Sequence, residues 1–167
     1  MNVLQRFWRQ PSAKYRNFQL AFLFLTLNFC IPAATYVVAP EVAQENMLRA
    51  NELLGGVAYT FPEAGSRVWR YLGAANVMTL GLMCLLLQVN LRYFRPTLLP
   101  LCFLKGYNAT LFLAGFLANT GFRGFLVVAL YDYLNTWMFW YFARGAHRDI
   151  RDRPDAELVP APLAFTP

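Results

Sequence analysis

The chain has 167 residues, of which 57% are apolar and only 14% are charged, and its formal net charge is +6. This balance excludes an ordinary water-soluble domain and predicts a protein whose main solvent is lipid. We expect no nucleic-acid partner, because the excess of positive charge is not arranged in a basic recognition motif.

Four stretches are long and apolar enough to cross the hydrocarbon core of a bilayer, which takes about 20 residues of helix. Backbone donors in lipid must be satisfied within the segment, so such stretches should be helical. The sequence therefore predicts an all-α integral membrane four-helix bundle. Its transmembrane domain covers 18–143, with spans at 18–39, 69–89, 97–118 and 123–143.

The first 17 residues mix aromatic and basic side chains, which is typical of a short segment lying on the cytoplasmic membrane surface. The span at 18–39 is longer than the apolar core of a cleaved signal peptide, which has roughly 7–15 residues. We therefore interpret it as a signal anchor.

The long connection between the first two spans contains a predicted amphipathic helix at 41–54. This segment lacks Gly and Pro, and it places Ala43, Met47, Ala50 and Leu54 on one helical face. Gly55 and Gly56 follow directly and should end the helix. We expect it on the outer membrane surface, either as a cover for the bundle or as a lid over a ligand site.

The last two spans are joined only by 119–122, so they should pack as an antiparallel hairpin. A stripe of small residues on the third span indicates close packing against another helix. Its members, four residues apart, are Gly106, Thr110, Ala114 and Ala118. The cytoplasmic half of the fourth span is crowded with aromatic rings, which suit an interfacial belt and core, or contact with lipid, pigment, quinone or another subunit.

The sequence predicts that 144–167 form a cytoplasmic tail, which is first basic and then rich in proline. Proline excludes regular helix from 154–167. We expect this part to lie against another subunit.

The distribution of basic residues predicts the orientation, because Lys and Arg near the ends of spans stay in the cytoplasm. The amino-terminal segment, the connection between the second and third spans, and the tail together hold ten basic and four acidic residues. Arg92, Arg95, Arg144 and Arg148 should contact lipid headgroups. The sequence thus predicts a multi-pass protein of the bacterial inner membrane with both termini in the cytoplasm.

Two charged residues fall inside predicted spans. Lys105 and Asp132 lie about 12 Å and about 17 Å from the cytoplasmic ends of their helices, at 1.5 Å per residue. Either charge alone in hydrocarbon costs at least about 2.5–3.5 kcal/mol, so we predict an intramembrane ion pair, with Asn108 and Asn135 as supporting polar residues. The pair is interpreted either as a relay or polar ligand seat, or as a structural link between two helices.

No catalytic or metal-binding constellation accompanies this pair. Cys30, Cys84 and Cys102 all fall inside spans, without a paired motif, and the only histidine, His147, is in the basic tail. We therefore expect no enzymatic activity, no metal and no intrinsic cofactor, and keep lipid or quinone as candidate ligands.

Single residues along the spans resemble those of the DoxX-like group of small four-helix membrane proteins. They are Ala39-Pro40, the Arg70–Gly73 entry to the second span, Lys105 and Asp132. The resemblance covers about 18–143 and implies a four-helix membrane fold, in a group of which some members accompany quinone-linked or sulfur-oxidising enzymes. It transfers no activity to this chain.

The sequence thus favours a non-catalytic accessory subunit of a larger bacterial membrane complex, respiratory or photosynthetic, whose partners are lipids and the helices of other subunits. The alternative is a small transporter, or a quinone-interacting component of electron transport, that uses Lys105 and Asp132.

Overall fold

The computed structural model describes residues 12–58, 66–118 and 120–151, with the backbone alone at 66–69. All regular structure in these ranges is helical, which confirms the predicted all-α class. The long helices are α2 (Ala13–Val38), α4 (Ser66–Val89), α6 (Leu98–Ala118) and α7 (Gly124–Arg151). Three shorter elements connect them: α3 (Pro40–Leu53), α5 (Leu91–Phe94) and the 3-10 turn η1 (Arg95–Thr97).

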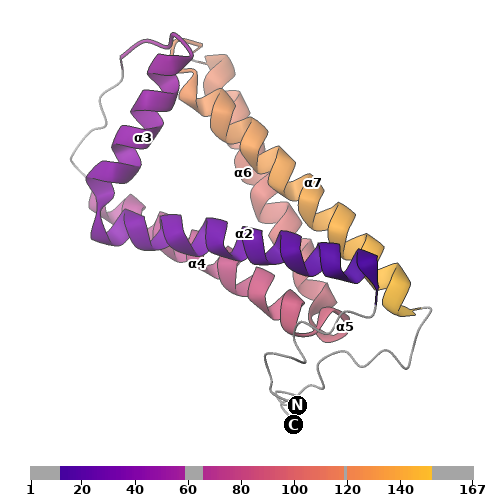
Figure 1. Ribbon diagram of the computed structural model, residues 1–167. Coiled ribbons are helices and arrows are strands. Elements are labelled where there is room, and N and C mark those ends of the chain that lie inside the picture. Colours follow the sequence, from indigo (N-terminus) through magenta and orange to yellow (C-terminus); the bar gives the residue numbers. More distant parts are fainter. Residues whose placement is uncertain (1–11, 59–65, 119, 152–167) are drawn as a thin grey trace.

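The long helices form two antiparallel pairs, α2 with α4 and α6 with α7 (Figure 1). The pairs meet where α2 begins and α7 ends, which we call the terminal end. They diverge toward the opposite end, where α3 runs from α2 to the turn between α6 and α7 (Figure 1). A compact four-helix bundle is therefore not confirmed, because α2 packs against both α4 and α7 whereas α4 and α6 contact each other only slightly.

An aromatic and aliphatic core fills the terminal end, where the pairs meet. The rings of Phe22 and Phe29 on α2 lie 6.0 and 5.9 Å from the ring of Phe139 on α7, centroid to centroid. Between α4 and α2, Gln88 Nε2 donates a hydrogen bond of 2.8 Å to Thr26 Oγ1. These contacts fix α2 between its two neighbours.

The predicted helix between the first two spans is confirmed as α3. Pro40 occupies its first turn, where a backbone N–H would have no acceptor within the helix, so the N–H that proline lacks is not missed. Gly55 follows the helix with a φ of +70°, a left-handed conformation that glycine adopts without a steric penalty, so it ends α3 as predicted.

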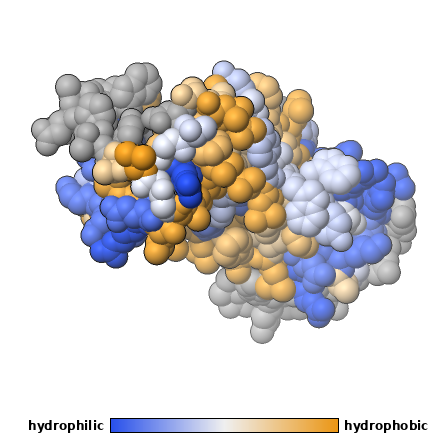
Figure 2. Space-filling view, turned by 90° about the horizontal axis from the view of Figure 1, so that it is seen from above, coloured by the Kyte–Doolittle hydropathy of each residue, from blue (hydrophilic) through white to orange (hydrophobic). Residues whose placement is uncertain are grey.

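Three helical segments are long and apolar enough to cross a membrane: Ala13–Val38, Arg70–Val89 and Leu91–Ala118. Figure 2 shows apolar residues across the middle of one face and hydrophilic residues gathered toward both ends. The fourth span, 123–143, stays a prediction, because α7 is long enough but carries Asp132, Asn135 and several Tyr and Trp residues that lower its hydropathy.

Two predicted boundaries differ from the structure. Helix α2 begins at Ala13, inside the predicted surface segment, because Ser12 caps it by accepting a 3.1 Å hydrogen bond from Tyr15 N. Helix α7 continues to Arg151, so the basic start of the predicted tail is helical; its Arg148 and Arg151 suit the negative end of the helix dipole. The predictions for 1–11 and 152–167 lie outside the described residues.

Candidate functional site

The structure brings Lys105 and Asp132 together between α6 and α7. Lys105 Nζ lies 2.6 Å from Asp132 Oδ1, and Asn108 Nδ2 donates a 2.6 Å hydrogen bond to Asp132 Oδ2. Both carboxylate oxygens therefore have a donor. Lys105 is 7% exposed and Asp132 is 1% exposed, so the pair is shielded within the molecule. The antiparallel packing of α6 and α7 produces this geometry, because it sets residues at equal depth side by side.

The ammonium group has a second neighbour on α2. Lys105 Nζ lies 4.9 Å from the centroid of the Phe29 ring, a geometry in which the ring face attracts the cation. This contact connects the ion pair to the aromatic core of the terminal end.

Asn135 does not support the ion pair as predicted. It is buried, but its Nδ2 has no hydrogen-bond partner within the described residues. Of the two predicted amides, only Asn108 therefore forms a hydrogen bond with the ion pair.

A cavity of about 560 Å³ adjoins the ion pair, in the space between the two diverging helix pairs. Most of its lining is apolar, and the polar groups come from four helices. Beside the ion pair and Asn108, they are Asn28, Tyr36, Asn76, Tyr107 and Tyr131. A mostly apolar pocket with a few convergent polar groups is the usual form of a small-molecule site.

One wall of this cavity holds an amide with an unused donor. Tyr131 OH donates a hydrogen bond to Asn28 Oδ1 across the space between α7 and α2. Asn28 Nδ2 is buried and has no partner within the described residues. An unsatisfied buried donor costs about 1–3 kcal/mol, so a small rotation that brings this amide to an acceptor in the cavity would be favourable.

Helix α3 covers one side of the cavity, where Met47 contributes to the lining. Its far end is attached to the turn between α6 and α7. There Asn51 Nδ2 donates to Val57 O at 2.8 Å, and Gly124 N donates to Asn51 Oδ1 at 3.3 Å. Arg123 also donates to Leu54 O, and Val57 N donates to Gly121 O at 2.8 Å.

Sequence reasoning identified one wall of the cavity and missed the rest. Lys105, Asn108 and Asp132 were predicted from α6 and α7, whereas Asn28, Asn76 and Tyr131 were not assigned to a site. Asn28 and Asn76 carried a signal, because an amide inside an apolar span needs a partner.

The predicted small-residue stripe packs against α7 only in its first half. A Cβ added at Gly106 would lie 3.9 Å from Thr136 Cγ2, and Thr110 Oγ1 lies 3.1 Å from Tyr133 OH. Ala114 and Ala118 are exposed, so the predicted close packing of this half stays a prediction. The buried residues of α6 are Leu101, Lys105 and Ala109, because α6 turns the side that carries the charge toward α7.

The four predicted headgroup arginines lie near the terminal end. Arg92 Nη2 donates a 2.5 Å hydrogen bond to Ile150 O, which joins α5 to the end of α7. Arg95 and Arg148 are exposed, and the guanidinium of Arg144 lies 4.6 Å from the centroid of the Trp140 ring. Burial and the nearby charges of Arg95, Arg151 and Arg92 lower the pKa of His147 below its usual 6.5, so this residue is neutral at pH 7.

Within the described ranges, no cluster of three or more His, Cys, Asp or Glu side chains is arranged to hold a metal ion. The fold and the site together define an α-helical protein with three helices apolar enough for a membrane and a buried ion pair beside a cavity. No family model, curated protein or solved structure matches the chain, and the resemblance to the DoxX-like group stays a prediction.

Proposed function

We propose that this protein crosses the bacterial inner membrane four times, with both termini in the cytoplasm, and binds a small amphipathic molecule between its two helix pairs. The observation that carries the proposal is the cavity of about 560 Å³, which is lined by the ion pair and by Asn28, whose amide has an unused donor. A membrane protein that keeps charged groups beside such a space is typical of transport or of binding a membrane-soluble ligand.

The lining favours an uncharged ligand with an apolar body and hydrogen-bond acceptors. Lys105 and Asp132 neutralise each other at 2.6 Å, so the site offers no net charge to an ion. Asn28 Nδ2 offers a hydrogen bond, and residues such as Leu80 and Leu111 offer apolar contact. A quinone ring, which is flat and carries two carbonyl oxygens, fits this description and is the first candidate.

The test uses decylubiquinone, a quinone with a short apolar tail, added to the protein purified in detergent. A ligand that binds only the folded state raises its thermal unfolding midpoint, so a concentration-dependent rise is expected. Asn28→Leu should weaken binding by about tenfold, which corresponds to the loss of one hydrogen bond of about 1.4 kcal/mol.

Two glycines provide a matched pair of variants for this test. An added Cβ at Gly73, which lines the cavity, meets no atom within 4 Å, and the same is true at Gly145 near the end of α7. Gly73→Leu should fill the cavity and abolish the rise, whereas Gly145→Leu should keep it. If wild type shows no rise, or if Gly73→Leu shows the same rise, the proposed quinone site is wrong.

A second candidate function is that of a non-catalytic accessory subunit in a respiratory or photosynthetic complex. It is favoured by the outer side of α6, where the exposed Ala114 and Ala118 would allow a partner helix to approach closely. Purification in a mild detergent, followed by mass analysis, should then recover stoichiometric partner chains. A monomer that purifies alone at full yield would contradict this candidate.

A further inference from the structure

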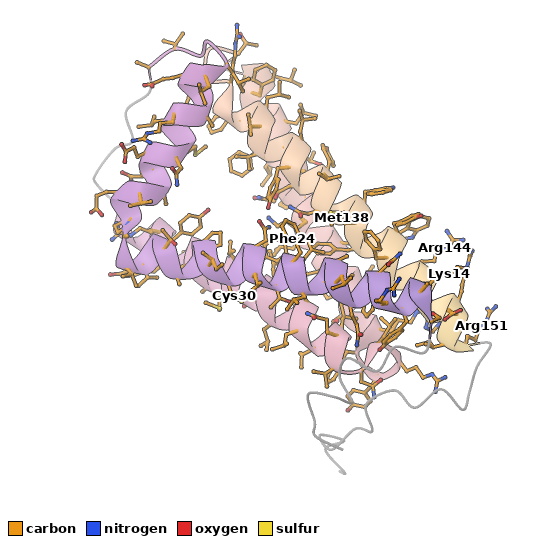
Figure 3. The ribbon with its side chains drawn as sticks, viewed as in Figure 1. Lys14, Phe24, Cys30, Met138, Arg144 and Arg151 are labelled. Atoms are coloured by element: carbon orange, nitrogen blue, oxygen red, sulfur yellow. The ribbon has the colours of Figure 1, made fainter. Side chains whose placement is uncertain are left out.

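A second pocket lies at the terminal end, outside the central cavity. It has a volume of about 330 Å³ and lies between the first turns of α2 and the last turns of α7. The side chains that matter for its chemistry are Lys14, Asn17, Trp140, Arg144 and Arg148, and Gly145 leaves room beside them. Figure 3 shows Lys14 and Arg144 close together where α2 begins and α7 nears its end.

The pocket gathers positive charge without a compensating acid. Three of its lining residues are cations, no acidic side chain belongs to the described lining, and no ion pair is formed by Lys14, Arg144 or Arg148 within the described residues. Like charges around one concave site create a positive potential, which an anion relieves.

The adjoining surface of α7 changes from aromatic to basic along one helical face. Trp137 and Tyr141 stack at 4.9 Å between ring centroids, Trp140 is 52% exposed, and Arg144 and Arg148 follow on the same side. Exposed Trp and Tyr rings are typical of the level where acyl chains give way to headgroups, and basic residues are typical of the headgroup level. The aromatic part of this face matches the acyl chains of a phospholipid, and the basic part matches its headgroup.

We propose that the pocket formed by Lys14, Asn17, Arg144 and Arg148 binds the phosphate of an anionic phospholipid, with the acyl chains lying along Trp137 and Tyr141. The three cations would bind the phosphodiester oxygens, and Asn17 would donate to an oxygen of the phosphate or glycerol. Basic pockets between helices at the cytoplasmic membrane surface bind anionic headgroups in this way. The site shares no lining residue with the central cavity, so it does not depend on a quinone binding there.

Binding is measured by native mass spectrometry of the full chain in detergent, titrated with short-chain phosphatidylglycerol, phosphatidylcholine or inorganic phosphate. Wild type should retain one phosphatidylglycerol in preference to phosphatidylcholine. Each removed cation should weaken binding by about fivefold, the factor expected for one basic residue at an anionic surface. The variant Lys14→Gln, Arg144→Gln, Arg148→Gln should therefore lose the preference.

Two further variants separate the pocket from general charge. Arg16→Gln with Arg151→Gln removes exposed cations near the same end that do not line the pocket, and this variant should keep the preference. Gly145→Leu changes no charge and adds a side chain where an added Cβ meets no atom within 4 Å, so the helix should form normally while the pocket is filled. It should lose the bound lipid, whereas Gly73→Leu should retain it.

Three results would overturn the proposal. The first is an equal loss of preference when Arg16 and Arg151 are replaced, which would show that overall charge decides binding. The second is undiminished lipid binding by Gly145→Leu. The third is inorganic phosphate binding as tightly as phosphatidylglycerol, which would identify a free anion rather than a lipid as the occupant.

Discussion

Asp132 is the residue on which the buried polar network converges, because it accepts hydrogen bonds from both Lys105 and Asn108. Each charge in the pair is tolerated only because the other is present. The single contact of 2.6 Å thus offsets the desolvation cost of both charges. It also sets the register of α6 against α7. The arrangement serves a ligand site and a structural link equally well.

At this scale we predict that Asp132→Asn alone destabilises the folded protein by about 3–5 kcal/mol, because Lys105 is left buried without its counter-charge. Replacing both residues, as Lys105→Met with Asp132→Leu, should recover most of that loss. The measurement is the free energy of unfolding in mixed micelles for Asp132→Asn, for the single variants Lys105→Met and Asp132→Leu, and for the double variant that combines these two. Losses that simply add up would show that the two side chains are not coupled.

Helix α3 is the element that closes the open end of the molecule. Only Ala39 separates it from the end of α2. Its other end is attached through Asn51, which is 1% exposed and contacts both Val57 and Gly124. Helix α3 is therefore attached at both ends and lines the cavity with Met47.

We expect Asn51→Ala to release the far end of α3 while leaving the long helices folded. The change removes two hydrogen bonds and leaves the buried Gly124 N–H without this partner, at a local cost of about 1–3 kcal/mol. Amide hydrogen exchange at Gly56, Val57 and Gly124 should become faster. Asn46→Ala, an exposed amide on the same helix, should leave these rates unchanged; if it accelerates them equally, Asn51 has no special role.

In the whole molecule, basic residues gather at the terminal end, and acidic residues of α3 lie toward the other end. The basic ends of α2 and α7 and the connection through α5 lie together at the terminal end, as the hydrogen bond from Arg92 to Ile150 O requires. Helix α3, with Glu41 and Glu45, lies toward the other end. An apolar region between two polar ends is the arrangement that a bilayer selects.

This arrangement predicts the outcome of labelling single cysteines in intact cells with a membrane-impermeant maleimide. The background replaces Cys30, Cys84 and Cys102, and the test positions are the exposed Tyr93, Arg148 and Glu45. Cysteines at Tyr93 and Arg148 should react only after the cells are opened, whereas the cysteine at Glu45 should react from outside. Labelling that puts Tyr93 and Arg148 on opposite sides would contradict the four-span topology.

The sequence by itself was sufficient for features that depend on local composition and spacing. The helical class, the helix that became α3 and its end at Gly55 follow from apolar run lengths and from glycine chemistry. The facing positions of Lys105 and Asp132 follow too, because the short connection forces the two helices to be antiparallel.

Only the tertiary structure decided how the two helix pairs diverge. The cavity between them depends on this divergence. Asn28 bonds to Tyr131 across 103 positions of the chain, and Lys14 lines one pocket with Arg144 across an even longer separation. Such contacts depend on how each helix is rotated and how the pairs cross. Helices as apolar as α2 and α6 carry little information about rotation in their sequence, because nearly every face is suited to lipid or to protein.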